Sequence, residues 1–286
     1  MKKEKCVVLL SGGLDSRLAV KIMQERDYEV LAVFFRLPFG TGCCNESCSF
    51  NFSQIEGVDL RVFDCTKEEL FEEYLDLVRR PKYKRGSGMN PCVDCRIFLF
   101  KKAKEFADKE GIKWVVTGEV LGQRPMSQMK TSMEIIEEES GLKGRIIRPL
   151  CEMGILGRRR EKQIALAKKF KITYPNSGGG CLLCEKEYTK KLKGILDKKI
   201  NYHDIQLLGI GRHFENSEII LGKNKDENRL LENEMGIKII PKQPGPTALI
   251  KNKKYLGKLE ERLIKKAKEL IQKYSKNKIV DFEIIN

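Results

Sequence analysis

The stretch Ser11-Gly12-Gly13-Leu14-Asp15-Ser16 decides the fold. It follows an apolar run at Cys6–Leu10 that predicts a buried strand, and it leads into Asp15–Gln24, which has the periodicity of a helix. Two consecutive glycines let the backbone turn tightly and bring several N–H groups close to one anion, and the start of a helix adds partial positive charge. With Ser11 and Ser16 as hydroxyl donors, the hexapeptide predicts a phosphate-binding loop; the alternative is an ordinary glycine turn. The glycine spacing argues against a P-loop kinase and against a dinucleotide-binding domain.

Strands and helices alternate through the first half of the chain. Strand-like apolar runs are separated by segments with helical periodicity. We expect strands at Cys6–Leu10, Glu29–Phe35, Leu60–Phe63, Lys113–Thr117 and Arg145–Leu150, and helices at Asp15–Gln24, Lys67–Val78, Val93–Asp108 and Arg159–Phe170. Strands joined by helices of this length predict an α/β fold with a Rossmann-like parallel sheet.

The pattern changes after the breaker Tyr174–Gly180. A basic helix is expected at Tyr188–Leu196, and the rest predicts a small α+β module. Its expected strands are Ile205–Gly211, Glu218–Leu221, Ile237–Ile240 and Thr247–Lys251, and its expected helices are Asn228–Met235 and Gly257–Tyr274. The predicted division is therefore an α/β domain at 1–175, a basic linker and helix with cysteines at 176–200, and an α+β domain at 201–286.

Composition narrows the class of protein. A chain of 286 residues with 41% hydrophobic residues is typical of two folded domains. No apolar run approaches the roughly 20 residues of a membrane span, and the apolar run near the N-terminus is too short for a signal peptide. We therefore expect a cytoplasmic protein that does not bind membranes. Ten cysteines in a reducing compartment favour metal binding or sulfur chemistry over disulfides.

The excess of positive charge is uneven. The net charge of +15 divides into +2 for residues 1–150, +8 for 151–200 and +5 for 201–286. The basic middle segment contains Arg158, Arg159 and Arg160 and the run Lys186–Lys199. This balance points to a nucleic-acid partner, and the alternative is a solvated lysine-rich surface.

Two C-x-x-C pairs, Cys92-Val93-Asp94-Cys95 and Cys181-Leu182-Leu183-Cys184, predict a metal or cluster site because this spacing places two thiolates on one metal. The first pair begins a predicted helix, where the helix dipole favours the thiolate. Structural zinc, an iron–sulfur cluster, and a metal-free redox or persulfide-relay pair are the three alternatives, and spacing does not separate zinc from iron–sulfur.

Other cysteines and one loop add further candidates. Cys43, Cys44 and Cys48 are expected to relay sulfur, bind a second metal or remain unreactive, whereas Cys6, Cys65 and Cys151 are expected in the core. The loop Thr117–Pro125 follows a predicted strand, where open α/β sheets bind ligands. Its Gly118 and Gly122 permit close approach to a nucleotide and Arg124 is a candidate for phosphate or nucleic acid; a solvated loop is the alternative.

The C-terminal module has two distinctive stretches, Gly211-Arg212-His213-Phe214 and Leu221–Asn228. Arg212, Lys223 and Lys225 lie on expected turns and are candidates for contacts to RNA phosphates. We interpret His213 as a core or surface histidine rather than a catalytic one.

SGGLDS resembles the PP-loop signature of the ATP pyrophosphatase superfamily, which cleaves ATP to AMP and pyrophosphate. The resemblance implies a PP-loop domain of the adenine nucleotide alpha hydrolase-like type. It also implies that the pyrophosphate portion of ATP is held, with Mg²⁺ nearby, by Ser11, Gly12, Gly13, Asp15 and Ser16. Asp15 is then a catalytic candidate, and the Thr-Gly pair of the superfamily places Gly118 against the adenosine.

Asn90-Pro91-Cys92 resembles the N-P-C segment of tRNA thiolation enzymes of the 2-thiouridylase and 4-thiouridine synthetase type. Cluster-dependent relatives hold a [4Fe-4S] cluster with three cysteines and leave one iron open for sulfide. The resemblance implies Cys92, Cys95 and a third ligand, with Cys181 preferred to Cys184, and it makes Cys92 and Cys181 catalytic candidates. Cys184 departs from that pattern, because four bound thiolates would leave no iron free.

The C-terminal module resembles the RNA-associated NFACT-R domain through G-R-H-F and G-K-N-x-x-x-N. Together the resemblances predict an ATP-dependent tRNA thiouridine synthase that adenylates a uridine carbonyl oxygen and replaces it with sulfur. Its expected partners are tRNA and a sulfur donor, either sulfide or a persulfide carrier, with a homodimer as one alternative assembly. The competing hypotheses are another PP-loop ligase or amidotransferase-like enzyme with structural Zn²⁺, and a non-catalytic RNA-binding module.

Overall fold

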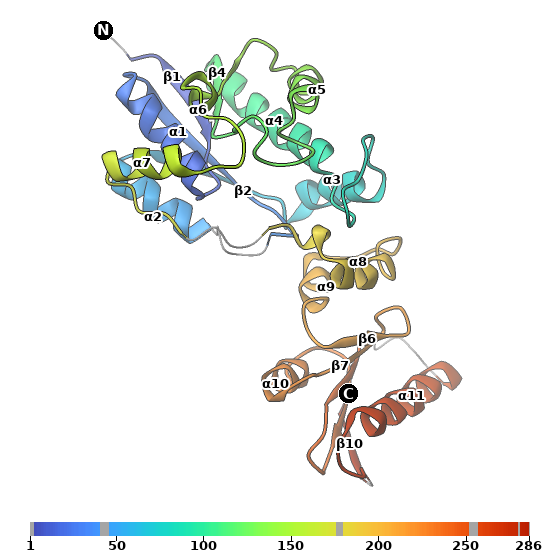
Figure 1. The fold of residues 1–286 in the computed structure, drawn as a ribbon. Helices are drawn as coiled ribbons and strands as arrows, with labels where there is room; N and C mark the ends of the chain where they lie inside the picture. Colours follow the sequence, from blue (N-terminus) through green and yellow to red (C-terminus); the bar gives the residue numbers. More distant parts are fainter. Residues whose placement is uncertain (1–2, 41–45, 176–179, 252–256, 280, 286) are drawn as a thin grey trace. The chain divides into compact units, whose positions relative to one another are not determined.

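The computed structural model describes residues 3–40, 46–175, 180–251, 257–279 and 281–285. The chain divides into two compact units, Met1–Glu185 and Lys186–Asn286 (Figure 1). The boundary lies inside the segment 176–200 that the sequence set apart, so that both C-x-x-C pairs belong to the first unit. Within the described ranges, none of the helices has the length and apolar character needed to cross a membrane.

The first unit is built on a parallel sheet, which confirms the predicted fold class. Its strands lie in the order β3-β2-β1-β4-β5, and every pairing is parallel. They are β1 (Lys5–Leu9), β2 (Glu29–Arg36), β3 (Asp59–Asp64), β4 (Trp114–Thr117) and β5 (Ile146–Ile147). The central strand β1 is buried on both faces, as its continuous apolar run predicts.

Helices cover both faces of this sheet (Figure 1). Helices α1, α2 and α7 lie on one face, and α3, α4 and α5 lie on the other. The helices of the unit are α1 (Leu14–Glu25), α2 (Glu46–Glu56), α3 (Glu68–Arg79), α4 (Cys92–Lys109), α5 (Lys130–Ser140), α6 (Pro149–Glu152) and α7 (Glu161–Lys169), and a 3₁₀ turn follows at Leu182–Cys184. The core under α1 includes Cys6 and Val8 from β1 and Leu18 from the helix.

The order of the strands creates a switch point between β1 and β4. The chain passes from β1 through β2 to β3 and then returns to the other side of β1 as β4. The loops that leave the carboxyl ends of β1 and β4 therefore diverge to opposite faces of the sheet. Ligands of open α/β sheets bind in the crevice that forms at such a point.

The second unit contains an antiparallel sheet in the order β10-β8-β9-β7-β6. Helix α11 packs against one face through Leu263 and Ala267, whereas Leu207 and Leu231 cover the other. The elements are α8 (Lys186–Lys193), α9 (Tyr202–Leu207), β6 (Arg212–Phe214), β7 (Ile219–Leu221), α10 (Lys225–Glu232), β8 (Ile237–Pro241), β9 (Ala248–Ile250), α11 (Lys258–Tyr274) and β10 (Phe282–Ile285). The α+β architecture expected for this part is confirmed (Figure 1).

One predicted strand is wrong, and another is shorter than expected. The expected strand Ile205–Gly211 begins inside helix α9, because Asn201 and Asp204 form a reciprocal capping box that starts the helix. The expected strand Arg145–Leu150 keeps only Ile146–Ile147, because Pro149 occupies the first turn of helix α6. Helices α2 and α5 and strands β6 and β10 are present in the structure but were not predicted from the sequence.

Candidate active site

The hexapeptide Ser11–Ser16 connects β1 to α1, so the expected strand–loop–helix order is confirmed. Gly12 has φ +80°, and a Cβ at this position would lie 3.0 Å from Ser49 Oγ, so the turn requires glycine. Gly13 caps α1 without a side-chain hydrogen bond. Ser16 Oγ donates to the Gly13 carbonyl at 2.9 Å and lies 3.3 Å from Ser11 Oγ. The first N–H groups of α1 are therefore left without a capping side chain, which suits an anion.

Arg17 anchors the loop from inside the protein. Its side chain is buried, and its Nε donates to the Gly12 carbonyl at 2.8 Å. Its two terminal nitrogens donate to the carbonyls of Thr173 at 2.7 Å and Cys48 at 3.2 Å, and the guanidinium lies 4.9 Å from the Phe52 ring centroid. The sequence reasoning missed this residue, although an arginine on the buried face of an amphipathic helix was a signal for such a role.

Gly118 lies directly against the phosphate loop. A Cβ on Gly118 would stand 2.4 Å from the carbonyl carbon of Asp15 and 2.6 Å from the amide nitrogen of Ser16. No side chain fits there without moving one of the two loops. The structure thus brings together the two glycine-bearing loops that the sequence singled out, at the switch point between β1 and β4.

Asp15 is the half-buried acid of the loop. Its Oδ2 accepts a hydrogen bond from Gln123 Nε2 at 3.0 Å, and its Oδ1 is buried without a hydrogen-bond partner among the described residues. Burial raises the pKa of Asp15, while the Gln123 hydrogen bond and the charges of Arg160 and Arg124 act in the opposite direction. Two arginines therefore act electrostatically on the carboxylate of the phosphate loop.

A buried ion-pair network fixes the loop that follows β4. Glu119 is 3% exposed and lies 3.1 Å from Arg96 Nε and 3.2 Å from Arg148 Nε. Thr117 Oγ1 donates to the same carboxylate and accepts from the Glu119 N–H. Arg96 belongs to the first turns of α4, so the network joins the end of β4 to the helix that carries the first C-x-x-C pair.

The two C-x-x-C segments lie side by side. Cys92 begins α4, and the residues before it contact the 3₁₀ turn Leu182–Cys184. The Met89 N–H donates to the Leu183 carbonyl at 2.7 Å, and a Cβ on Gly88 would lie 2.2 Å from the same oxygen. Thiols that are separated by 85 intervening residues are therefore brought into one region of the first unit.

Each sulfur of the first pair has a polar neighbour. Asn90 Nδ2 donates to Cys92 Sγ at 3.2 Å, and Tyr74 Oη lies 3.2 Å from Cys95 Sγ. Burial raises the pKa of Cys95, whereas the Tyr74 hydrogen bond opposes that effect.

The second pair divides into a half-buried and an exposed cysteine. Burial, together with the nearby Cys95, raises the pKa of Cys181 to about 12. Cys184 is exposed, and partial burial together with Cys92 raises its pKa. Across the part of the chain that the structure describes, no three Cys, His, Asp or Glu side chains are arranged to hold a metal ion. The metal set Cys92, Cys95, Cys181 and Cys184 therefore stays a prediction.

The loop after β4 connects the two centres. Gln123 of this loop donates a hydrogen bond to Asp15 of the phosphate loop. Three residues later, Met126 Sδ lies 3.8 Å from the amide nitrogen of Asn90, which also donates to Cys92. The phosphate loop and Asn90, which donates to Cys92, thus contact one short segment of chain.

The remaining cysteines separate by burial. Cys6 and Cys65 are fully buried, as expected for core residues, and burial raises the pKa of each thiol to about 12. Cys151 is half-buried and donates to the Glu119 carbonyl at 3.3 Å. Cys48 lies in α2 beside Gly12, whereas Cys43 and Cys44 lie outside the described residues.

The basic run Arg158–Arg160 divides in two. Arg158 and Arg159 are exposed. Arg160 is half-buried, and its charge lowers the pKa of Asp15, against the larger effect of burial. In the second unit, Lys223 and Lys225 are exposed. These four exposed cations are available to a phosphate backbone.

Two other candidates of the second unit are occupied by internal contacts. The Arg212 guanidinium lies 4.9 Å from the Tyr274 ring centroid. Burial, with Lys191 nearby, lowers the pKa of His213 to about 4, and His213 Nε2 lies 2.8 Å from the Ile210 carbonyl oxygen. His213 is thus a half-buried structural residue at neutral pH.

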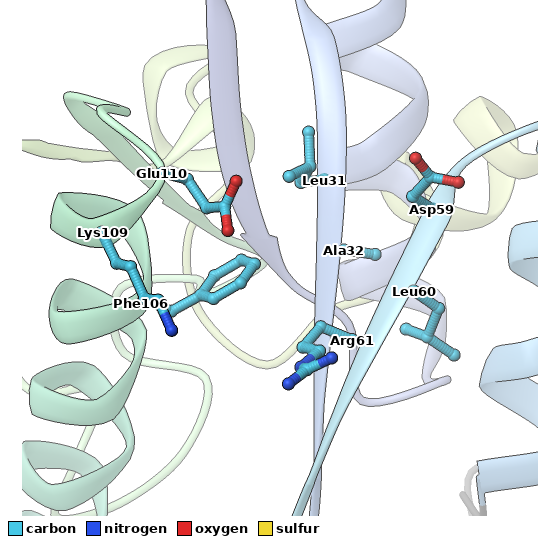
Figure 2. A pocket seen from close by; sticks show the side chains of 8 residues that line it. All are labelled: Leu31, Ala32, Asp59, Leu60, Arg61, Phe106, Lys109 and Glu110. Carbon is cyan, nitrogen blue, oxygen red and sulfur yellow. The ribbon is translucent and has the colours of Figure 1, made fainter.

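A separate groove of about 300 Å³ lies at the opposite end of the first sheet. Figure 2 shows its walls, which come from β2 and β3 on one side and from α4 and its end on the other. The lining residues are Leu31, Ala32, Asp59, Leu60, Arg61, Phe106, Lys109 and Glu110. The strand residues lie at the amino ends of β2 and β3, so this groove is distinct from the phosphate loop at the carboxyl ends.

Several known proteins resemble this chain in sequence. The tRNA-specific 2-thiouridylase MnmA of Petrotoga mobilis is 32% identical over 135 residues, which cover 42% of this chain and 36% of the relative. The bifunctional protein NifU/MnmA of Rubrobacter xylanophilus is 34% identical over 118 residues, which cover 39% of this chain and 24% of the relative. The chain thus spans about a third or less of the length of these curated relatives.

A solved structure, described as a 4-thiouridine synthetase–RNA complex with bound ATP, is 22% identical with a TM-score of 0.47, and the match covers 72% of this chain and 50% of that one. A family model described as thiamine biosynthesis protein (ThiI) matches residues 1–186. The resemblance to PP-loop tRNA thiolation enzymes is confirmed for this part of the chain, while the NFACT-R-like assignment stays a prediction. Because the matched residues are well over half of the 286, the chain belongs to the ThiI family.

Proposed function

We propose that this protein is an ATP-dependent tRNA sulfurtransferase that forms AMP and pyrophosphate while it replaces a uridine carbonyl oxygen with sulfur. The observation that carries the proposal is the joint contact of one loop with both centres. Gly118 lies against Asp15 and Ser16, Gln123 contacts Asp15, and Met126 contacts Asn90 beside Cys92. An adenylating site and a sulfur site have to act on the same base, and this arrangement supports that requirement.

The nucleotide would bind at the switch point. Ser11, Gly12, Gly13, Asp15 and Ser16 would hold the pyrophosphate portion of ATP, and Gly118 would lie against the adenosine. Free N–H groups at the start of α1 supply donors, and Arg124 and Arg160 supply positive charge. Mg²⁺ prefers oxygen ligands, and the buried Oδ1 of Asp15, which has no hydrogen-bond partner among the described residues, fits such a cation.

The carbonyl oxygen of uridine is a poor leaving group, so it has to be activated before sulfur can replace it. The uridine carbonyl oxygen attacks the α-phosphorus of ATP, a new P–O bond forms and pyrophosphate leaves. Sulfide then attacks the activated carbon, and the oxygen leaves with AMP. If a persulfide carrier attacks instead, a cysteine thiol has to cleave the S–S bond, which leaves the sulfur on the base and a disulfide between that cysteine and the carrier. Fixed N–H groups and arginines that match the charge developing on the phosphates would provide much of the acceleration.

Cys92, Cys95 and Cys181 would hold a [4Fe-4S] cluster. Thiolates suit iron, and the thiols lie close together: besides burial, Cys95 raises the pKa of Cys181, and Cys92 raises the pKa of Cys95. A bound cation would relieve the repulsion between the thiolates. Cys184 is exposed, which supports its place outside the ligand set. A cluster bound there would supply an iron able to hold the incoming sulfur.

The substrate would be a tRNA. The exposed Arg158 and Arg159 lie in the segment next to Arg160 and would contact phosphates, while the target base would have to leave its stack to reach the nucleotide. The relative from Petrotoga mobilis is a tRNA-specific 2-thiouridylase, which supports this class of substrate.

The adenylation half of the proposal is tested with ATP, tRNA and sulfide. The wild-type protein should release AMP and produce a thiolated nucleoside that mass spectrometry detects. Asp15→Ala should abolish AMP release and retain tRNA binding. Asp59→Ala, at the amino end of β3, is the matched control and should keep full activity. Undiminished AMP release by Asp15→Ala would remove the phosphate-loop assignment.

The sulfur half is tested on protein purified without oxygen. A brown protein with broad visible absorption and about four irons per chain supports the cluster. Cys92→Ser should lose that absorption, whereas Cys184→Ser should retain it. A colourless protein with one bound zinc would contradict the cluster, and loss of iron in Cys184→Ser would contradict the three-ligand set.

A further inference from the structure

Gln123 makes a contact that the proposed mechanism does not yet use. Its Nε2 donates to Asp15 Oδ2 at 3.0 Å, across 108 positions of sequence. A tight turn presents the side chain to the acid, because the Gln123 N–H donates to the Val120 carbonyl and Gly122 adopts φ +77°. The contact is therefore built by the loop and does not depend on a freely moving surface side chain.

The contact divides the two oxygens of Asp15 into different roles. Oδ2 is occupied by the amide, whereas Oδ1 is buried and without a partner in the described parts of the chain. Without the amide, both oxygens of a carboxylate close to Arg124 and Arg160 would be equally free to rotate toward those cations. An amide donor leaves the charge of the carboxylate intact while it fixes the plane of the group.

We propose that Gln123 is a positioning residue that orients Asp15, so that Oδ1 stays available to the magnesium–nucleotide. This inference rests on the proposed function of the phosphate loop. Gln123 acts through Asp15 and is not assigned a contact to the reacting atoms. The preorganised carboxylate then requires no reorientation when the nucleotide binds.

A second glutamine of the same loop provides a matched comparison. Gln128 is buried, its Oε1 accepts from the Arg124 N–H at 3.1 Å, and its carbonyl accepts from the Gly122 N–H at 2.7 Å. Gln128 thus holds the backbone of the loop, whereas Gln123 extends from the loop to Asp15. Gln128→Ala reports what a loosened loop does, and Gln123→Ala reports what the lost contact does.

The test is a double-mutant cycle in the full-length chain. Equilibrium affinity for magnesium–ATP, measured without tRNA or sulfur donor, is compared for wild type, Gln123→Ala, Asp15→Ala and the double variant. Hydrogen bonds to charged groups make a loss of about ten- to a hundredfold the expected effect of Gln123→Ala in the wild-type background. In the Asp15→Ala background the same change should have no further effect, because the group through which Gln123 acts is gone.

Further variants keep the result decisive. Gln123→Glu preserves the shape of the side chain and exchanges the donor for a second carboxylate, so it should bind magnesium–ATP more weakly than wild type even if Gln123→Ala fails to fold. Gln128→Ala should weaken binding to a similar extent in both backgrounds, as expected for a loop effect that does not pass through Asp15. Equal losses from Gln123→Ala with and without Asp15 would overturn the inference. Wild-type protein that does not bind ATP would instead overturn the proposed function.

Discussion

The phosphate loop of the first unit and the G-R-H-F and G-K-N stretches of the second unit are both distinctive in sequence, but they use their polar atoms differently. In the phosphate loop, helix α1 starts without a capping side chain and Asp15 Oδ1 has no partner among the described residues. In the second unit, Asn224 caps α10, and Asn228 bonds both the Gly245 carbonyl and the Thr247 N–H. The first motif leaves groups for a ligand, whereas the second consumes them in the fold.

The glycines repeat the same contrast. A Cβ on Gly118 would collide with the backbone of a different loop at the ligand end of the sheet, whereas a Cβ on Gly222 would lie 2.0 Å from Asn228 Oδ1, a side chain of its own motif. A motif therefore indicates a binding site when its close approach joins two loops at a ligand-binding edge. When the close approach serves a local cap or turn, an equally distinctive motif has a structural role only.

The largest effect expected from this contrast is on Gly118→Ala. A Cβ 2.4 Å from the Asp15 carbonyl carbon forces the loops apart by about an ångström, and a misplacement of that size costs about a hundredfold or more in rate. We expect AMP formation to fall accordingly with little change in unfolding midpoint of the second unit. Gly222→Ala is the matched control, and it should lower stability while AMP formation by the folded fraction stays at the wild-type rate. Equal rate losses in the two variants would break the comparison.

His213 provides the second test, because its burial makes the second unit sensitive to acid. Its pKa is about 4 in the folded chain, against an ordinary value of 6.5, because of burial with Lys191 and Lys251 nearby. The folded state then binds fewer protons than the unfolded state between these values. Stability is therefore fully present above pH 6.5 and is lost as pH falls toward 4, by about 3 kcal/mol in total.

The measurement is urea unfolding at pH 7 and pH 4.5 for the wild type and His213→Gln. The glutamine retains a donor for the Ile210 carbonyl and does not titrate, so its stability should fall less on acidification. The ring is withdrawn from water and lies near Lys191, which is why protonation of the wild-type ring is unfavourable. Identical pH dependence for the two proteins would show that His213 is not the group that responds.

Asn228→Ala should also lower the stability of the second unit, but by less. The change removes partners from the Gly245 carbonyl and the Thr247 N–H, and such unsatisfied groups cost about 1–3 kcal/mol. Affinity for tRNA, measured on folded protein, should not change. A loss of tRNA affinity without a loss of stability would show that the motif binds RNA directly, and the distinction between the two regions would fail.

Much of the first unit follows from local pattern. The glycine loop between an apolar strand and an amphipathic helix predicted β1 and α1, and the rule that ligands bind at the carboxyl ends of parallel strands predicted that Gly118 lies near the phosphate site. The resemblance predicted that both cysteine pairs contribute to one site, and the contact of Met89 with Leu183 agrees with that prediction.

The parts that escaped prediction depend on contacts between distant residues or on short local caps. Gln123 and Asp15 are 108 positions apart, and no periodicity links a loop glutamine to an aspartate that distant in the chain. Arg17 is buried by contacts to Thr173 and Cys48 that the sequence of α1 does not encode. The apolar run at Ile205–Gly211 favoured a strand, but the capping box of Asn201 and Asp204 decided for helix α9.

The smallest expected effects concern the exposed cations, because each single phosphate contact contributes only a small part of the affinity for RNA. Lys223→Ala and Lys225→Ala remove exposed charges within the second motif and leave Asn224 and Asn228 in place. Each should reduce the magnitude of the slope of log affinity against log salt by about one if the lysine contacts a tRNA phosphate. Arg158→Ala and Arg159→Ala test the corresponding exposed charges of the first unit by the same titration. A changed slope for the arginines alone would assign the RNA contact to the first unit, and the distinctive residues of the second unit would then serve only its fold.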